Sequence, residues 1–330
     1  MSSTPASTLP GPAGEGDGRP GPIHAVPVRR PAVWVSVVIT TIVVLMVADV
    51  LVTNKNIHWP FVFQAMIQSP VIRGLLLGTL LGTVGSMALG VVLGITLGVM
   101  RLSDNWVLRW VSWVYVWFFR AIPRYVLLST MGVLGYLWPK GLEVGVPFLH
   151  QVAGWFGGEL DPYITTVNAN HLFVGLLGGI LGLGLSEGAY MAEIARAGIL
   201  SVDQGQHEAA HALGMSKSTT MRRIVLPQAM RVIVPPTGNE AVGMLKDTSL
   251  LVALPVTAEM FYQLSAIGNR EFEPFAISVA AILWYLILGS VFMAVQAWLE
   301  RRYGRGFGSR TATEWGAAAR VLGRLNAGAR

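Results

Sequence analysis

Residues 74–100, GLLLGTLLGTVGSMALGVVLGITLGVM, decide the fold class of this chain because the whole stretch contains no charged side chain. As an α-helix it would be about 40 Å long at 1.5 Å per residue, which exceeds the roughly 30 Å hydrocarbon core of a bilayer. Glycines recur at every fourth position in two series: Gly74, Gly78, Gly82 and Gly90, Gly94, Gly98. This spacing lets other membrane helices approach closely. We predict a tilted or protruding transmembrane helix with a glycine face for packing.

The composition agrees with a membrane protein. Only 13% of the 330 residues are charged and 53% are hydrophobic, whereas an ordinary soluble domain is roughly 25% charged. The chain has no cysteine, which excludes disulfides, thiolate metal sites and cysteine nucleophiles. The formal net charge of +6 would suggest nucleic acid in a soluble protein, but in a membrane protein basic residues mark cytoplasmic loops. We therefore predict an all-α integral membrane protein without a nucleic-acid partner.

Apolar stretches of spanning length recur along the chain and predict about six transmembrane helices. They are residues 33–52, 74–100, 106–138, 171–197, 232–262 and 275–299. The third is interrupted by Arg120, Pro123 and Arg124, and a mixed loop is expected at 139–170. Most Lys and Arg fall in alternate loops and in both tails, so we expect both termini to be cytoplasmic and the protein to lie in the cell membrane.

The predicted organisation has four parts. Residues 1–32, rich in Pro, Gly, Ser and Ala, cannot offset the entropy of ordering and form a disordered cytoplasmic tail. Residues 33–73 form an extra N-terminal transmembrane helix with an outer loop. Residues 74–302 form the core, with a polar cytoplasmic loop at 201–231. Residues 303–330 form a basic cytoplasmic tail. The tryptophans of the third span recur at helical spacing and predict an aromatic belt at the membrane interface: Trp106, Trp110, Trp113 and Trp117.

The polar loop 201–231 carries the most specific pattern. It reads Glu-Ala-Ala, three residues, Gly, nine residues, Ile, one residue, Leu-Pro. Gly214 suits a left-handed helix cap, Ser216 can N-cap a second short helix, and Pro227 is expected to stop that helix. The pattern resembles the signature of permease subunits of ATP-binding-cassette importers. The stretches 189–214 and 224–240 and the run 245–250 resemble the polar amino-acid branch of that family.

The resemblance covers about residues 74–302 and implies a type I importer permease bundle. It implies that loop 201–231, here called the coupling loop, seats in a groove of an ATPase through Glu208, Ala209, Ala210, Gly214, Ile224, Leu226 and Pro227. It also implies a second permease subunit, an extracytoplasmic solute-binding protein and an amino-acid substrate. The chain contains no phosphate-loop motif. ATP and Mg²⁺ are therefore expected on separate ATPase subunits, with no cofactor bound by this chain and no catalytic site of its own.

One stretch departs from the family pattern. The family usually has Arg-Gly-Thr-Pro followed by Leu-Leu-Val-Gln, whereas this chain reads Arg-Ala-Ile-Pro-Arg-Tyr-Val-Leu at 120–127. Arg120 and Pro123 match, but the Gly, Thr and Gln are replaced, and Arg124 stands where the pattern has Leu.

Two other functions compete with import by an ATP-driven permease. His207-Glu208-Ala209-Ala210-His211 satisfies the His-Glu-x-x-His pattern of zinc proteases, which would make the chain a membrane metalloprotease. The extended motif needs a third His where Lys217 stands. An ion-driven secondary transporter is the other alternative, and it would work without an ATPase partner.

Charges within apolar stretches are the candidates for a substrate path, because each costs about 2.5 to 3.5 kcal/mol near the bilayer centre. The charged candidates are Arg120, Glu240, Lys246 and Asp247, and the polar residues Asn239, Thr248 and Ser249 near them are added as hydrogen-bonding candidates. Lys246 and Asp247 could hold the two charged ends of an amino acid, or they could simply pair with each other. Glu187 and Glu193 are interpreted as interfacial, with Glu193 pairing with Arg196. Acids and bases are both present, so the sequence leaves the choice of amino acid open.

Overall fold

The computed structural model describes residues 31–54, 57–134, 137–138, 142–145, 154–155, 163–254 and 256–303. Contacts divide the chain into two units, one comprising Met1–Asn54 with Gly308–Arg330 and the other Lys55–Phe307. In the first unit the described part is helix α1 (Pro31–Thr53), whose described side chains are all exposed. The predicted span at 33–52 is therefore helical. The predicted tails fall almost wholly outside the described residues.

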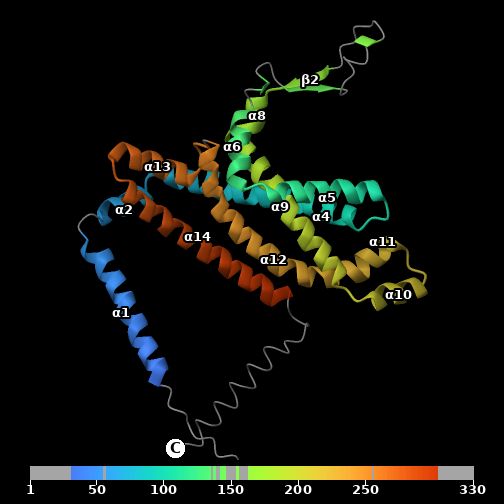
Figure 1. Ribbon diagram of the computed structural model, residues 1–330, viewed down its shortest axis with the longest axis horizontal. Coiled ribbons are helices and arrows are strands. Elements are labelled where there is room, and N and C mark those ends of the chain that lie inside the picture. The colour runs from blue at the N-terminus through green and yellow to red at the C-terminus, as the bar shows by residue number, and fades with distance from the viewer. Residues whose placement is uncertain are drawn as a thin grey trace, which may run out of the picture. The chain divides into compact units, whose positions relative to one another are not determined.

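The second unit is a helical bundle built around two glycine-rich helices, α4 (Leu81–Arg101) and α9 (Gly175–Leu200) (Figure 1). Helix α4 continues without a break from α3 (Ser69–Arg73) through the π-helical segment η1 (Gly74–Leu80). A Cβ atom added at Gly94 would lie 2.3 Å from Met191 Cβ on α9, and one added at Gly90 would lie 2.5 Å from Glu187 Cγ. The prediction of a glycine packing face is thus confirmed.

The interrupted third stretch folds as two helices, α5 (Trp106–Ala121) and α6 (Arg124–Leu134). The side chain of Asn105 caps α5 by accepting a hydrogen bond from Val107 N at 2.9 Å. Pro123 lies between the two helices, where its ring cannot continue the first one. The four tryptophans form an exposed stripe on α5, with Trp113 and Trp117 stacked at 6.3 Å between ring centroids. Their depth in the bilayer stays a prediction.

The fifth stretch is not one span, as predicted, but two helices joined by a 3₁₀ segment. Helix α12 (Leu226–Asp247) is followed by η4 (Thr248–Ala253) and α13 (Met260–Glu271). The new helix begins after Glu259, a buried residue whose Oε2 accepts a hydrogen bond from Tyr262 N at 3.0 Å and caps α13.

The outer loop predicted before residue 74 contains two short helices rather than irregular chain. Helix α2 (Trp59–Met66) packs on α14 (Pro274–Tyr303), and α3 packs on α13. Together α2, α13 and α14 enclose the largest apolar core of this unit.

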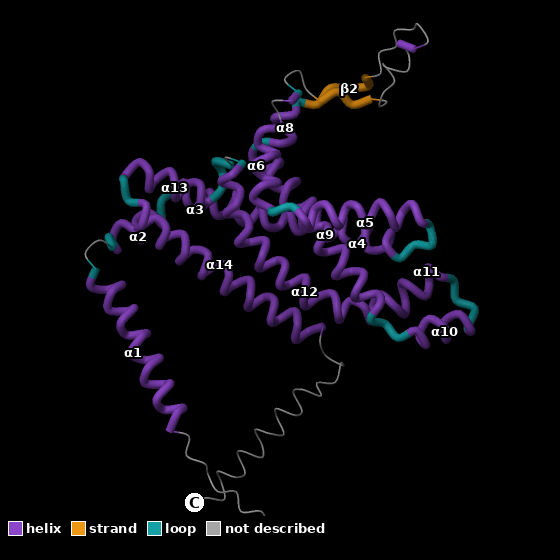
Figure 2. The backbone as a smooth tube through the Cα atoms, in the orientation of Figure 1, coloured by secondary structure: helices purple, strands orange, loops and turns teal. Residues whose placement is uncertain are grey.

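The predicted mixed loop holds the small non-helical part of the fold. Strands β1 (Leu142–Gly145) and β2 (Tyr163–Val167) pair antiparallel, and α8 (Ala169–Phe173) follows (Figure 2). The described residues are therefore helical apart from this antiparallel pair of strands.

Among the described residues three helical stretches are long and apolar enough to cross a membrane: Val33–Thr53, Ser69–Arg101 and Pro274–Tyr303. Helices α9 and α12 have 26 and 22 residues and are of spanning length, but both carry charged side chains. Some of these charged side chains lie where α9 and α12 pack against neighbouring helices.

Candidate functional site

One arginine bridges side chains of two other helices. Arg124, at the start of α6, donates from Nη2 to Glu187 Oε2 on α9 at 2.8 Å and from Nη1 to Asp247 Oδ2 at the end of α12. The Glu187 side chain is fully buried and that of Arg124 is 14% exposed. The other carboxylate oxygen of Glu187, Oε1, is buried and has no hydrogen-bond partner among the described residues.

An aromatic ring and two more charges complete the arrangement. The guanidinium carbons of Arg124 and Arg120 lie 4.9 Å and 5.5 Å from the centroid of the Tyr190 ring, within the range of cation–π attraction. Glu240 lies two helical turns before Asp247 on α12 and interacts electrostatically with both arginines. We call these five charged residues the charge cluster: Arg120, Arg124, Glu187, Glu240 and Asp247. Three carboxylates against two arginines leave it one formal negative charge in excess.

Local sequence explains why these side chains meet. Pro123 interrupts the helix, so Arg124 begins a new one beside α9 and η4. Gly90 on α4 leaves room for the Glu187 side chain. Asp247 is the last residue of α12, where the backbone changes to a 3₁₀ helix.

The structure separates the predicted substrate-path candidates. Asp247 joins the charge cluster with Glu240 and Arg120, but Lys246 points elsewhere, because successive side chains on a helix diverge by about 100°. Lys246 is exposed and lines an open groove of about 550 Å³ with Ser249 and other residues of α13 and α14. The local pair of Lys246 with Asp247 is therefore not formed, since Asp247 pairs with Arg124.

The remaining two candidates have structural partners. The Thr248 hydroxyl is buried and donates to the Leu245 carbonyl at 2.6 Å. Asn239 is exposed and its Oδ1 accepts a hydrogen bond from Gln296 Nε2 on α14 at 2.7 Å.

The interpretation of Glu187 as interfacial was wrong, because its side chain is fully buried between α4 and α6. A signal was available: a carboxylate set among the small residues Gly184, Ser186 and Gly188 of an apolar helix needs a buried partner. The companion prediction for Glu193 is confirmed, since Arg196 Nε donates to its Oε2 at 3.1 Å.

The coupling loop folds as the sequence predicted at its two caps. Helix α10 (Gln204–Ala212) ends before Gly214, which has a left-handed φ of 74°. The Ser216 hydroxyl accepts a hydrogen bond from Thr219 N at 3.3 Å and caps α11 (Lys217–Thr220). The exposed side of the loop includes Glu208, Ala209 and Leu213.

The predicted stop at Pro227 is wrong. Helix α11 runs through the π-helical segment η3 (Met221–Val225) directly into α12, so residues 217–247 form one continuous helical rod. Pro227 lies in the first turn of α12, and the wider π turn before it accommodates the missing N–H donor. The rod connects the coupling loop to Asp247.

The two histidines of the protease-like motif lie on one face of α10. His207 and His211 line a small pocket of about 210 Å³ together with Lys217, Thr220 and Met221. In the part of the chain that the structure describes, no three His, Cys, Asp or Glu side chains gather in a way that could hold a metal ion.

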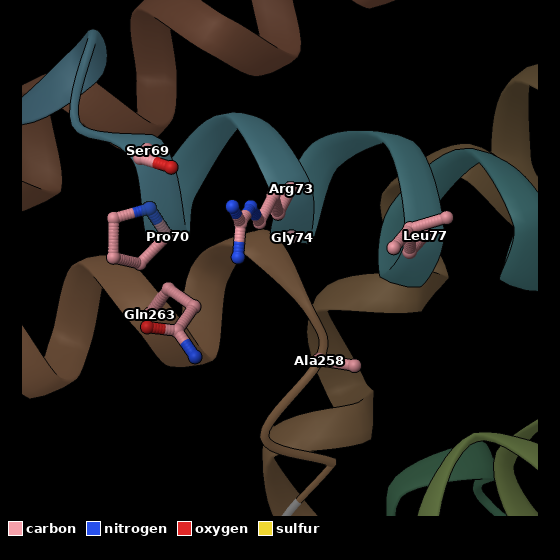
Figure 3. Close-up of a pocket in the computed structure, with 7 residues that line it drawn as sticks. All are labelled: Ser69, Pro70, Arg73, Gly74, Leu77, Ala258 and Gln263. Carbon is pink, nitrogen blue, oxygen red and sulfur yellow. The ribbon is translucent and has the colours of Figure 1, made fainter.

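Another cavity, of about 340 Å³, lies between the α3–η1 helix and α13 (Figure 3). Arg73 and Gln263 extend into the space between these helices, beside Ser69 and Pro70. Arg73 is the one charged group in its lining. This cavity therefore has no arrangement of acids and bases comparable to the charge cluster.

Comparison with known proteins identifies the class. Residues 90–305 match the family of binding-protein-dependent transport system inner membrane components. The arginine transport system permease protein ArgU of Corynebacterium glutamicum is 40% identical over 304 residues, which cover 91% of this chain and 89% of the relative. The L-cystine transport system permease protein TcyB of Bacillus subtilis is 35% identical, with 62% and 74% of the two chains covered.

A solved structure of an amino acid ABC transporter with histidines matches with a TM-score of 0.53 at 27% identity, covering 71% of this chain and 94% of the other. The chain therefore belongs to the family of inner membrane components of binding-protein-dependent transport systems. It is a permease subunit with the type I importer fold. Neither the metalloprotease nor the ion-driven transporter is supported.

Proposed function

We propose that this permease subunit imports an amino acid through the charge cluster. A solute-binding protein delivers the substrate at the outer face, and separate ATPase subunits hydrolyse ATP with Mg²⁺. The observation that carries the proposal is the cluster itself, in which acids and bases converge among apolar helices. Charges at membrane depth are costly and mark substrate or ion pathways. The similarity to permeases named for arginine and cystine transport supports an amino-acid substrate.

The cluster can recognise both ends of an amino acid. Among the described residues Arg120 has no carboxylate within ion-pair distance, and its guanidinium faces Tyr190. It is placed to bind the substrate α-carboxylate by paired N–H donors. The excess formal negative charge of the cluster, which includes Glu240 two turns before Asp247 on α12, provides the counter-charge for an ammonium group.

The helical rod at 217–247 provides a physical link between ATP hydrolysis and the cluster. One end forms the second half of the coupling loop, which docks on an ATPase subunit through Glu208 and the other residues of the motif. The other end carries Glu240 and Asp247. A push on the loop is therefore transmitted along one continuous helix, which contains Pro235 and Pro236, to two carboxylates of the cluster. A second permease subunit completes the path, and both termini face the cytoplasm.

Reconstitution tests this function. The full chain is placed in proteoliposomes with its ATPase subunits and binding protein, and uptake of labelled arginine, cystine and glutamate is measured with ATP inside or outside the vesicle. We expect one of these amino acids to accumulate only when ATP is available to the ATPase. Accumulation without the ATPase subunits, or no amino-acid uptake in an assembled and ATP-hydrolysing complex, would overturn the proposal.

A further inference from the structure

The position of Arg124 poses a question that amino-acid import alone does not answer. Its guanidinium binds two carboxylates: one terminal nitrogen binds Glu187, the other binds Asp247, and one face lies over Tyr190. Both of its terminal nitrogens are thus bound to carboxylates of this chain. Arg120, in contrast, has no ion pair among the described residues, so its guanidinium is available to a substrate carboxylate.

The surroundings of Arg124 are those of a binding site for a cationic group. Two carboxylates from different helices and an aromatic ring enclose it, and its side chain is 14% exposed. Planar guanidinium groups favour this combination of carboxylates and an aromatic face. The buried Oε1 of Glu187 has no partner among the described residues, so the pocket has accepting capacity that Arg124 does not fill. A buried acceptor left in this way is unusual and indicates a ligand or a second state.

We propose that Arg124 is a tethered stand-in for the substrate. In the unloaded protein its guanidinium occupies the place between Glu187 and Asp247 that the side-chain cation of a basic amino acid takes during transport. The proposal rests on the proposed function and narrows it to basic amino acids. Arg120, which also lies against the Tyr190 ring, then holds the α-carboxylate.

The exchange conserves charge, which makes it favourable at membrane depth. When a basic side chain enters and Arg124 swings out, the two carboxylates keep one cation between them. The two carboxylates are therefore never without a cation in a low-dielectric site, where an unpaired charge is strongly disfavoured. Arg124 starts a helix directly after Pro123, so its side chain can change rotamer without disrupting a preceding helical turn. A neutral or acidic substrate cannot replace the Arg124 cation, so Arg124 also selects against neutral and acidic amino acids.

Chemical rescue tests the proposal. The full permease–ATPase complex carrying Arg124→Ala is purified in detergent, and its thermal unfolding is followed with and without guanidinium chloride at millimolar concentration, with sodium chloride as the salt control. We expect Arg124→Ala to melt below wild type and guanidinium to restore most of the difference. Arg196→Ala is the matched control, because Arg196 also pairs with a carboxylate but lies outside the cluster. Guanidinium should not restore the melting temperature of Arg196→Ala.

Binding of labelled L-arginine gives the second measurement. The apparent Kd for Arg124→Ala should be lower than for wild type by about tenfold, as expected if the tethered group occupies the site in about nine of ten molecules. The affinity for labelled L-leucine should be the same in Arg124→Ala and in wild type. If Arg124→Ala cannot be recovered, Arg124→Gln replaces it, with the same comparisons.

Two results overturn the proposal. One is guanidinium rescue of Arg124→Ala no greater than that of Arg196→Ala. The other is L-arginine affinity that is unchanged or weaker in the folded variant. Both are readouts of binding and stability, so they are independent of whether the wild-type complex accumulates any amino acid, which tests the proposed function separately.

Discussion

The charge cluster and the coupling loop are built in opposite ways. The cluster gathers residues from α5, α6, α9 and α12 into a site where Glu187 is fully buried. The coupling loop is a continuous stretch whose caps bond within a few residues of themselves and whose surface is exposed. In the cluster each charge depends on partners from distant parts of the chain, whereas in the loop each feature depends on its neighbours in sequence. Substitutions in the cluster should therefore lower the stability of the whole fold. Substitutions in the loop should change only the local structure of the loop.

The largest effect is expected at Glu187. Glu187→Ala leaves Arg124 without one of its two partners in a buried site, and breaking a buried pair typically costs about 3–5 kcal/mol. We expect a strongly lowered melting temperature of the purified complex and loss of uptake. Glu193→Ala is the control, because Glu193 is partly exposed and such a pair contributes about 1 kcal/mol or less. Equal melting temperatures for the two variants would contradict the contrast drawn above.

A smaller effect is expected at Gly90, which gives Glu187 its space. The Cβ of Gly90→Ala would lie 2.5 Å from Glu187 Cγ, and overpacking of this kind costs about 1–3 kcal/mol. Uptake should fall because Glu187 is displaced from Arg124. The matched variant is Gly243→Ala on α12, where an added Cβ meets nothing within 4 Å. If both variants unfold and transport alike, the α4–α9 contact does not position the cluster.

In the coupling loop, Gly214→Ala should produce a local effect. At a φ of 74° an alanine is strained by about 1–2 kcal/mol. We expect a global melting temperature close to wild type, because strain in the loop is relieved by local rearrangement, but reduced ATP-driven uptake per ATP hydrolysed. Gly214→Asn should recover most of the coupling, since asparagine tolerates the left-handed region. An alanine variant with normal coupling would show that the cap geometry is dispensable.

The smallest effect is expected from the paired change His207→Gln with His211→Gln. These side chains line only a small pocket next to Lys217, and such surface changes usually stay within about 0.5 kcal/mol. Uptake and melting temperature should match wild type, and the purified chain should contain no stoichiometric zinc by elemental analysis. Stoichiometric zinc that disappears in the variant would revive the metalloprotease hypothesis.

The same contrast explains which predictions from sequence succeeded. The Gly214 cap, the Ser216 cap and the Glu193–Arg196 pair were predictable because each is a contact within a few residues. The glycine face of 74–100 was predictable because spacing along one helix determines it. The stop at Pro227 failed because a π turn upstream changed which N–H groups needed partners. The single fifth span failed because the backbone changes to a 3₁₀ helix after Asp247 and another helix begins after the cap at Glu259.

The charge cluster shows where sequence reasoning ends. Sequence marked Arg120, Arg124, Glu240 and Asp247 as charges in apolar surroundings, and it wrongly assigned Glu187 to the interface. It could not show that Arg124 bridges Glu187 and Asp247, which are 63 and 123 residues away. It also could not show that Lys246 and Asp247, neighbours in sequence, face different environments. Both facts depend on how each helix is rotated about its own axis relative to the rest of the bundle.

The sequence by itself determined that this protein is a helical membrane permease, because apolar length, glycine spacing and the coupling motif are properties of continuous stretches. Only the tertiary structure decided which membrane charges meet, since that depends on how α6, α9 and α12 pack together. The physical reason is the range of the interactions: caps and helix faces are formed within a few residues, whereas a buried ion pair exists only where separate helices converge.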